Sequence, residues 1–178
     1  MKKVVLRFGT YAALAELLSF VAAWVVLSLT HMGIGAQGNL GWAAILCPLV
    51  FIYFGVRYYR DRYNNREISF LVALKIGLLI TIMPSFFYAL IETIYVAWID
   101  PDFYKNIFAR ELQVLKTTLP PAEYSLRASA MEQELIRDNN PVYNFSTIAL
   151  FIAACGAIIS LLSSLLLMRR FKKEVVTA

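Results

Sequence analysis

Three charged side chains stand alone inside long apolar stretches of the sequence: Glu16, Lys75 and Glu92. A charge at the centre of a membrane helix costs about 2.5–3.5 kcal/mol, so such residues commonly pair or mark an ion or proton pathway. Counted by helix rise from the start of its apolar stretch, Glu16 lies about 13 Å deep and Lys75 about 10 Å deep. We therefore expect an ion pair between them, acting as a structural lock or as part of a relay. The alternative is that Lys75 snorkels alone to the interface.

Glu92 belongs to a stripe of polar side chains that recur at alternating spacings of four and three residues. The stripe consists of Thr81, Ser85, Tyr88, Glu92 and Tyr95. This spacing places them on one face of a helix. They either line a water-accessible cavity or form hydrogen bonds between packed helices, with Glu92 protonated. The sequence supports both interpretations equally.

Other signs of chemistry are few. The sequence has no metalloprotease, nucleophile-elbow or phosphate-loop motif and no Cys/His cluster, and its single histidine, His31, falls in a predicted turn. We therefore expect no catalytic residue, no metal site and no cofactor, and a protein that is not an enzyme. Cys47 and Cys155 lie in apolar runs, where we expect reduced, buried thiols.

Four apolar runs carry these residues. The chain of 178 residues is 60% hydrophobic and 16% charged, with a mean hydropathy of +0.62, whereas soluble domains are about 25% charged. Each run is long enough to cross a hydrocarbon core of about 30 Å. The sequence predicts an all-α integral membrane protein, a single domain over residues 1–178, with spans at about 8–29, 40–58, 68–99 and 142–168.

Local signals refine these spans. Pro48 and Pro84 predict kinks in the second and third spans, and Asn64 followed by Glu67 resembles a capping box that opens the third. In the fourth span, three small residues recur every four positions: Gly156, Ser160 and Ser164. Such a face lets helix backbones approach closely. We expect it to pack within the chain, with homodimerisation as the alternative.

The segment 102–140 is the only sizeable polar part. Two amphipathic helices are predicted, at about 102–118 and 121–137, separated by Pro120-Pro121. Their apolar faces hold Tyr104, Phe108, Leu112 and Leu115 on the first helix and Tyr124, Ala128, Met131 and Leu135 on the second. We expect a helical hairpin in which these faces pack together, because pairing hides apolar area from water.

Charge predicts the orientation. The N-terminus, the connection between the second and third spans and the C-terminal tail together hold eleven Lys/Arg and three acids, whereas residues 100–141 hold five Lys/Arg and seven acids. The positive-inside rule then places both termini in the cytoplasm and the hairpin outside. Because the basic clusters flank apolar runs, they indicate membrane orientation and not nucleic-acid binding.

Several short stretches, taken in order, resemble a known family. They are Gly55-Val-Arg-Tyr-Tyr-Arg-Asp61, Ile68-Ser-Phe70, Ala73-Leu-Lys-Ile-Gly77, Asp100-Pro-Asp-Phe103, Asn140-Pro141 and 156–167 followed by Arg169-Arg170. The sequence is similar to the four-span, Bacteroidetes-type bacterial membrane proteins called domain of unknown function 4199. The resemblance implies a four-span protein of a bacterial inner membrane and no particular activity. Family members tend to share Lys75 and Gly77 and usually carry a glycine where this chain has Asn65-Arg66.

These observations favour an accessory, assembly or sensing component that lies in the lipid bilayer. Its hairpin, 102–140, would meet a protein partner or a second copy of the chain. The alternative is a small ion- or proton-coupled transporter or channel that uses Glu92 together with Glu16 and Lys75.

Overall fold

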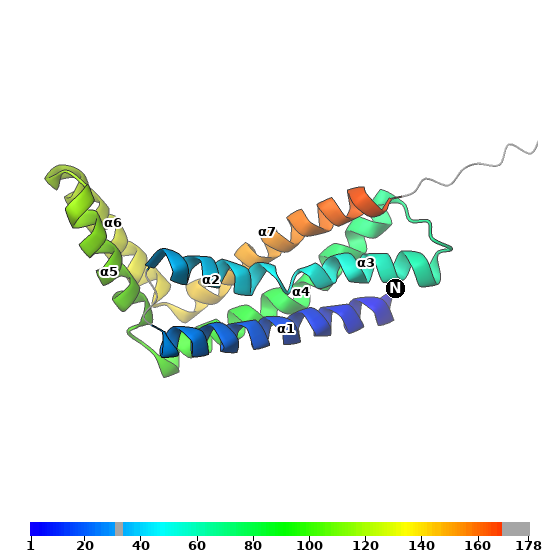
Figure 1. Cartoon of the computed structure of the whole chain (residues 1–178), viewed down its shortest axis with the longest axis horizontal. Helices are drawn as coiled ribbons and strands as arrows, with labels where there is room; N and C mark the ends of the chain where they lie inside the picture. Colours follow the sequence, from blue (N-terminus) through cyan, green and yellow to red (C-terminus); the bar gives the residue numbers. More distant parts are fainter. Residues whose placement is uncertain (31–33, 169–178) are drawn as a thin grey trace, which may run out of the picture. The chain divides into compact units, whose positions relative to one another are not determined.

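The structure is a computed structural model that describes residues 1–30 and 34–168, and every described regular element is helical (Figure 1). His31 and the basic tail from Arg169 onward lie outside the described residues. The elements are α1 (Lys2–Leu29), α2 (Ile34–Leu46), α3 (Val50–Tyr63), α4 (Phe70–Ile94), the π-helix η1 (Tyr95–Ile99), α5 (Phe103–Thr118), α6 (Pro121–Asp138) and α7 (Pro141–Leu167).

Four helical segments are long and apolar enough to cross a membrane. They are Lys2–Leu29, Gly38–Tyr63, Phe70–Ile99 and Pro141–Leu167. Less than half of the apolar window of each segment is buried in the isolated chain, as expected of helices whose outer faces meet lipid rather than water. The predicted fold class is confirmed: the protein is an all-α integral membrane protein with four transmembrane helices.

The described part of the chain divides into two compact units. Among the described residues, the larger unit comprises 1–30, 34–88 and 150–168, and the smaller unit comprises Ala89–Ala149. The smaller unit therefore contains the predicted hairpin and also the adjoining ends of α4 and α7. Hydrogen bonds that join Tyr104 of the hairpin to Glu92 and Asn144 tie these helix ends to it.

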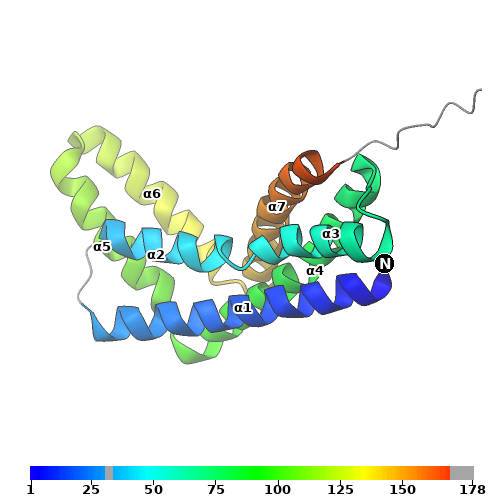
Figure 2. The same ribbon diagram turned by 45° about the vertical axis from the view of Figure 1, so that its right-hand side comes forward.

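In the larger unit, α1 packs against α2 and α3, and α3 runs antiparallel to α1 (Figures 1 and 2). The rings of Phe8 and Tyr58 lie 5.4 Å apart between centroids, and those of Tyr11 and Phe51 lie 6.2 Å apart. Residues further along α1 thus contact residues earlier in α3. This antiparallel register indicates which residues of the second span lie beside each α1 side chain.

The second span is interrupted, not merely kinked as predicted. Helix α2 begins at Ile34, ahead of the predicted Leu40, and ends at Leu46, and α3 begins at Val50. Pro48 lies in the turn between them. Proline cannot donate the N–H that would continue the helix, so the span is divided into two shorter helices.

The connection from α3 to α4 is a turn that differs from the predicted capping box. Asn64 Nδ2 donates to the main-chain oxygen of Glu67 at 2.6 Å instead of capping the next helix, which begins only at Phe70. Asn65 and Arg66 have positive φ angles of 48° and 64°. Only glycine adopts this left-handed region without steric cost, so Asn65 and Arg66 hold this turn at some cost in backbone strain.

The smaller unit contains the hairpin of α5 and α6, which pack against each other. Pro120 is the N-cap residue of α6 and Pro121 its first helical residue, as the proline pair predicts. Met131 is buried, and Phe108 and Leu112 of α5 line the same groove as Leu135 of α6. These residues of the two predicted apolar faces therefore lie together.

Candidate functional site

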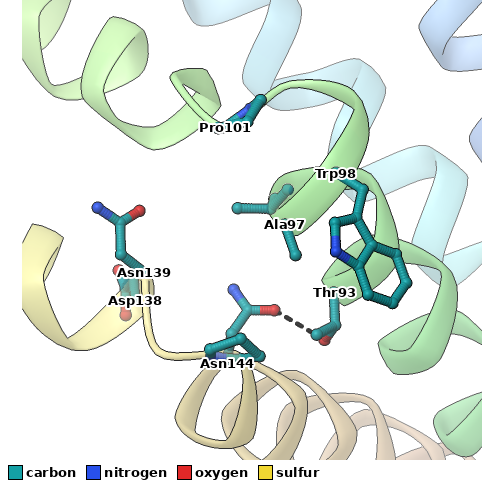
Figure 3. A pocket seen from close by; sticks show the side chains of 9 residues that line it. Thr93, Ala97, Trp98, Pro101, Asp138, Asn139 and Asn144 are labelled. Carbon is teal, nitrogen blue, oxygen red and sulfur yellow. Dashed lines mark hydrogen bonds between the residues drawn. The ribbon is translucent and has the colours of Figure 1, made fainter.

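A chain of three hydrogen bonds joins α4, α5 and α7 in the smaller unit. Thr93 Oγ1 donates to Asn144 Oδ1 at 3.0 Å, as Figure 3 shows. Asn144 Nδ2 donates to the Tyr104 hydroxyl at 2.8 Å, and that hydroxyl donates to Glu92 Oε1 at 3.0 Å. Residues from three helices are thus held together at the base of the hairpin.

Local structure positions each member of this chain. Asn140 Oδ1 accepts the N–H groups of Val142 and Tyr143 at 3.0 and 3.2 Å and so caps the start of α7. This cap sets Asn144 one turn into the helix, where its side chain is buried. Tyr104 lies in the first turn of α5, shortly after the chain leaves α4 and η1.

The hydrogen-bond chain orients side chains but does not relay protons. Burial and the neighbouring Glu92 carboxylate raise the pKa of the Tyr104 hydroxyl above its ordinary value, so it stays protonated and donates. The Asn144 amide in the middle donates one hydrogen bond and accepts another, but it neither gains nor loses a proton. A relay from Glu92 through this chain would be interrupted at Asn144.

A cavity of about 400 Å³ adjoins this chain. Figure 3 shows Asp138 and Asn139 facing Trp98 and Thr93 across it, with Asn144 between them. Burial and Glu134 raise the pKa of Asp138, partly opposed by Arg137. The remaining lining residues are Val96, Ala97, Pro101 and Pro141. The cavity offers a carboxyl, amide, hydroxyl and indole group, which suit binding of a polar group more than nucleophilic chemistry.

The π-helix η1 forms one wall of the cavity. The Asp100 N–H donates to the Tyr95 oxygen at 2.9 Å, one residue further back than in an α-helix. Val96, Ala97 and Trp98 of this turn line the cavity. Single π-turns frequently occur at functional sites, so the cavity and η1 together mark the smaller unit's candidate site.

The predicted polar stripe divides between the two units. Glu92 belongs to the smaller unit, whereas Ser85 and Tyr88 belong to the larger one. Ser85 is buried and donates to the Thr81 oxygen at 2.9 Å, within its own helix. The Tyr88 ring contacts Phe20 of α1 edge to face, 5.8 Å between centroids. Ser85 and Tyr88 are thus engaged in the packing of α4.

The expected ion pair between Glu16 and Lys75 is not formed. Glu16 is 1% exposed, and neither of its carboxylate oxygens has a hydrogen-bond partner among the described residues. A Cβ on Gly9 would touch Met83, and Phe20 contacts Tyr88. Glu16, which lies between Gly9 and Phe20, is therefore level with the turns of α4 after Met83, well beyond Lys75. The depths counted from sequence assumed that α1 and α4 begin at the same level.

The small residues of α7 lie against α4. A Cβ on Gly156 would clash with the Thr81 side chain, and a Cβ on Gly77 would lie 3.2 Å from the Ser160 Cα. Ser164 is completely buried, and its hydroxyl donates to the Ser160 oxygen at 2.6 Å. Gly156 and Ser160 thus pack within the chain, and Gly77 is the matching residue on α4.

Sequence reasoning did not find Tyr104, Asn144, Asp138 or Trp98 as site residues. Their contacts join helices that are far apart in the sequence, as between Tyr104 and Asn144. One signal was available: Asn144 is a lone amide in the first turns of an otherwise apolar run, and a buried amide requires hydrogen-bond partners.

Comparison with known proteins agrees with the architecture. No curated protein and no solved structure matches the chain. The model of one family, described as protein of unknown function (DUF4199), matches residues 7–169. This match covers all four membrane helices and the hairpin, and the chain therefore belongs to the DUF4199 family.

Proposed function

We propose that this protein is a non-enzymatic accessory, assembly or sensing component of a bacterial cytoplasmic membrane. In this proposal the hairpin of α5 and α6 binds an apolar helical segment of a protein partner. The observation that carries it is an open groove of about 410 Å³ between the two helices. The groove is lined by Lys105, Phe108, Ala109, Leu112, Ala128, Ser129, Met131, Glu132 and Leu135.

The groove has the composition of a helix-binding surface. Most of its lining is apolar, and Lys105 and Glu132 supply charged groups. Amphipathic helices bind such grooves through apolar side chains spaced three and four residues apart. Outside the groove, α6 also exposes the apolar side chains of Leu126 and Ile136, by 72% and 69%.

The hydrogen-bond chain supports a sensing role. Tyr104 begins the helix that forms one side of the groove, and its hydroxyl bonds Glu92 of α4 and Asn144 of α7. A partner that moves α5 would therefore strain the hydrogen bonds to the ends of two membrane helices.

A pair of cross-linking variants on one helix tests the groove. A photo-reactive amino acid replaces either Ala109, which lines the groove, or Gln113, which is exposed elsewhere on α5. We expect a discrete protein adduct in intact cells from position 109 and none from position 113. An added Ala128→Trp substitution, which fills the groove, should abolish the adduct. Equal adducts at both positions, or adducts to lipid alone, would contradict partner binding.

The proposal also includes an orientation, with both termini in the cytoplasm and the hairpin outside. The Arg7 guanidinium lies 5.6 Å from the centre of the Tyr58 ring, so the basic start of α1 and the basic end of α3 share one end of the larger unit. This agreement supports the positive-inside assignment.

Cysteine labelling in intact cells tests this orientation. In a variant without Cys47 and Cys155, cysteines at Asn106 and Glu123 should react with an impermeant reagent, and one at Asn65 should not. The reverse pattern would overturn the assignment.

A further inference from the structure

The interruption of the second span leaves main-chain oxygens without helical partners. The Ala44 oxygen would be bonded in a continuous helix by residue 48, but Pro48 has no N–H. The Val50 N–H, which would reach Leu46 in a continuous helix, donates to Cys47 at 3.2 Å instead. Ala44 and Pro48 are both buried, so the residue whose oxygen is freed is packed inside the larger unit.

Glu16 lies at the level of this interruption. Phe8 lies beside Tyr58, and Tyr11, almost one turn later, lies beside Phe51. The same antiparallel register, continued along α1, brings Glu16 level with Leu46 at the end of α2. Figure 2 shows α1 running alongside both α2 and α3 across the gap between them.

An ionised carboxylate with no partner is very unfavourable in such a position. Interrupted membrane helices elsewhere use their freed carbonyl oxygens and C-terminal ends to coordinate Na⁺ or a proton. The C-terminus of α2 also carries the negative end of its helix dipole. The Pro48 interruption thus brings freed main-chain oxygens and the negative end of α2 to the level of a buried acidic group.

We propose that Glu16 and the main-chain oxygens freed at the Pro48 interruption form a binding site for a monovalent alkali cation. A single carboxylate neutralises one positive charge, whereas a divalent ion would leave an uncompensated charge in the apolar interior. Hard oxygen ligands suit an alkali cation, and the described residues contain no cluster of His, Cys, Asp and Glu for a transition metal. This site lies in the larger unit and does not depend on partner binding by the hairpin.

Thermal unfolding of the purified full chain in detergent tests the site. Lithium, sodium and potassium chloride are compared with choline chloride at one ionic strength. A ligand that binds the folded state raises the melting temperature, and we expect a rise of about 3–5 °C with the preferred alkali cation. Glu16→Gln should remove this rise, whereas Glu123→Gln, the same change at an exposed position of α6, should keep it.

A second variant decides the outcome if Glu16→Gln does not fold. Pro48→Ala restores the N–H that can bond Ala44 and should remove the cation response while leaving the helices intact. Gly41→Ala, in the same span with open space around the new methyl group, is its control. A wild-type melting temperature that is the same in all four salts would overturn the proposal, as would a cation response that survives both Glu16→Gln and Pro48→Ala.

Discussion

Replacing Tyr104 by phenylalanine removes one hydroxyl that makes two hydrogen bonds. Asn144 Nδ2 then loses its acceptor at 2.8 Å and Glu92 Oε1 loses its donor at 3.0 Å. Each hydrogen bond contributes about 1 kcal/mol, and leaving a buried group unpaired costs more. We expect a loss of about 2–3 kcal/mol in the free energy of unfolding, which for a chain of this length lowers the melting temperature by about 5–10 °C.

Thermal unfolding in detergent measures this loss, with Tyr143→Phe as the control. Tyr143 is 41% exposed and contacts Arg137 through the face of its ring, 6.0 Å from the guanidinium, which phenylalanine retains. The measurement is repeated in a Glu92→Leu background, where the carboxylate no longer needs a donor. There Tyr104→Phe should cost less, and the difference is the coupling energy. A Tyr104→Phe protein that melts within about 1 °C of wild type would refute the reasoning, as would an equal loss in both backgrounds.

Three further predictions use the same thermal measurement. Gly77→Ala should lower the free energy of unfolding by about 1–3 kcal/mol, because its Cβ would lie 3.2 Å from the Ser160 Cα; Gly41→Ala, with nothing within 4 Å, should be neutral or stabilising. Arg66→Gly should stabilise by up to about 1 kcal/mol by relieving a φ angle of 64°, and destabilisation would show that the turn does not hold that conformation. The effects of Glu16→Gln and Lys75→Met should be additive, because the two residues stand at different levels, and a measurable coupling energy would show that they meet.

Hydropathy and proline placement were enough to predict the four membrane helices and the hairpin. The Pro120-Pro121 pair marks the boundary between α5 and α6, since proline both ends a helix and suits the start of the next. These features are local, because each depends on a few neighbouring residues or on one apolar run.

The parts that could not be predicted depend on how helices are offset from one another. Glu16 and Lys75 have opposite charges at similar counted depths, but the contact of Gly9 with Met83 shows that α1 is shifted along α4. Tyr104 and Asn144 meet only because α5 and α7 both begin near the end of α4. No periodicity within one helix contains that information.

The π-turn η1 has a consequence for chain length. The Asp100 N–H reaches back five residues to Tyr95. This hydrogen-bonded turn therefore contains one residue more than a turn of the α-helix that precedes it. Deleting Ala97 would let the helix continue in regular α form and would turn Trp98 by about a quarter of a revolution relative to Glu92. A relative with one residue fewer between positions 95 and 100 should therefore have a regular α-helix in place of the π-turn, with the side chain at the position of Trp98 turned to another direction.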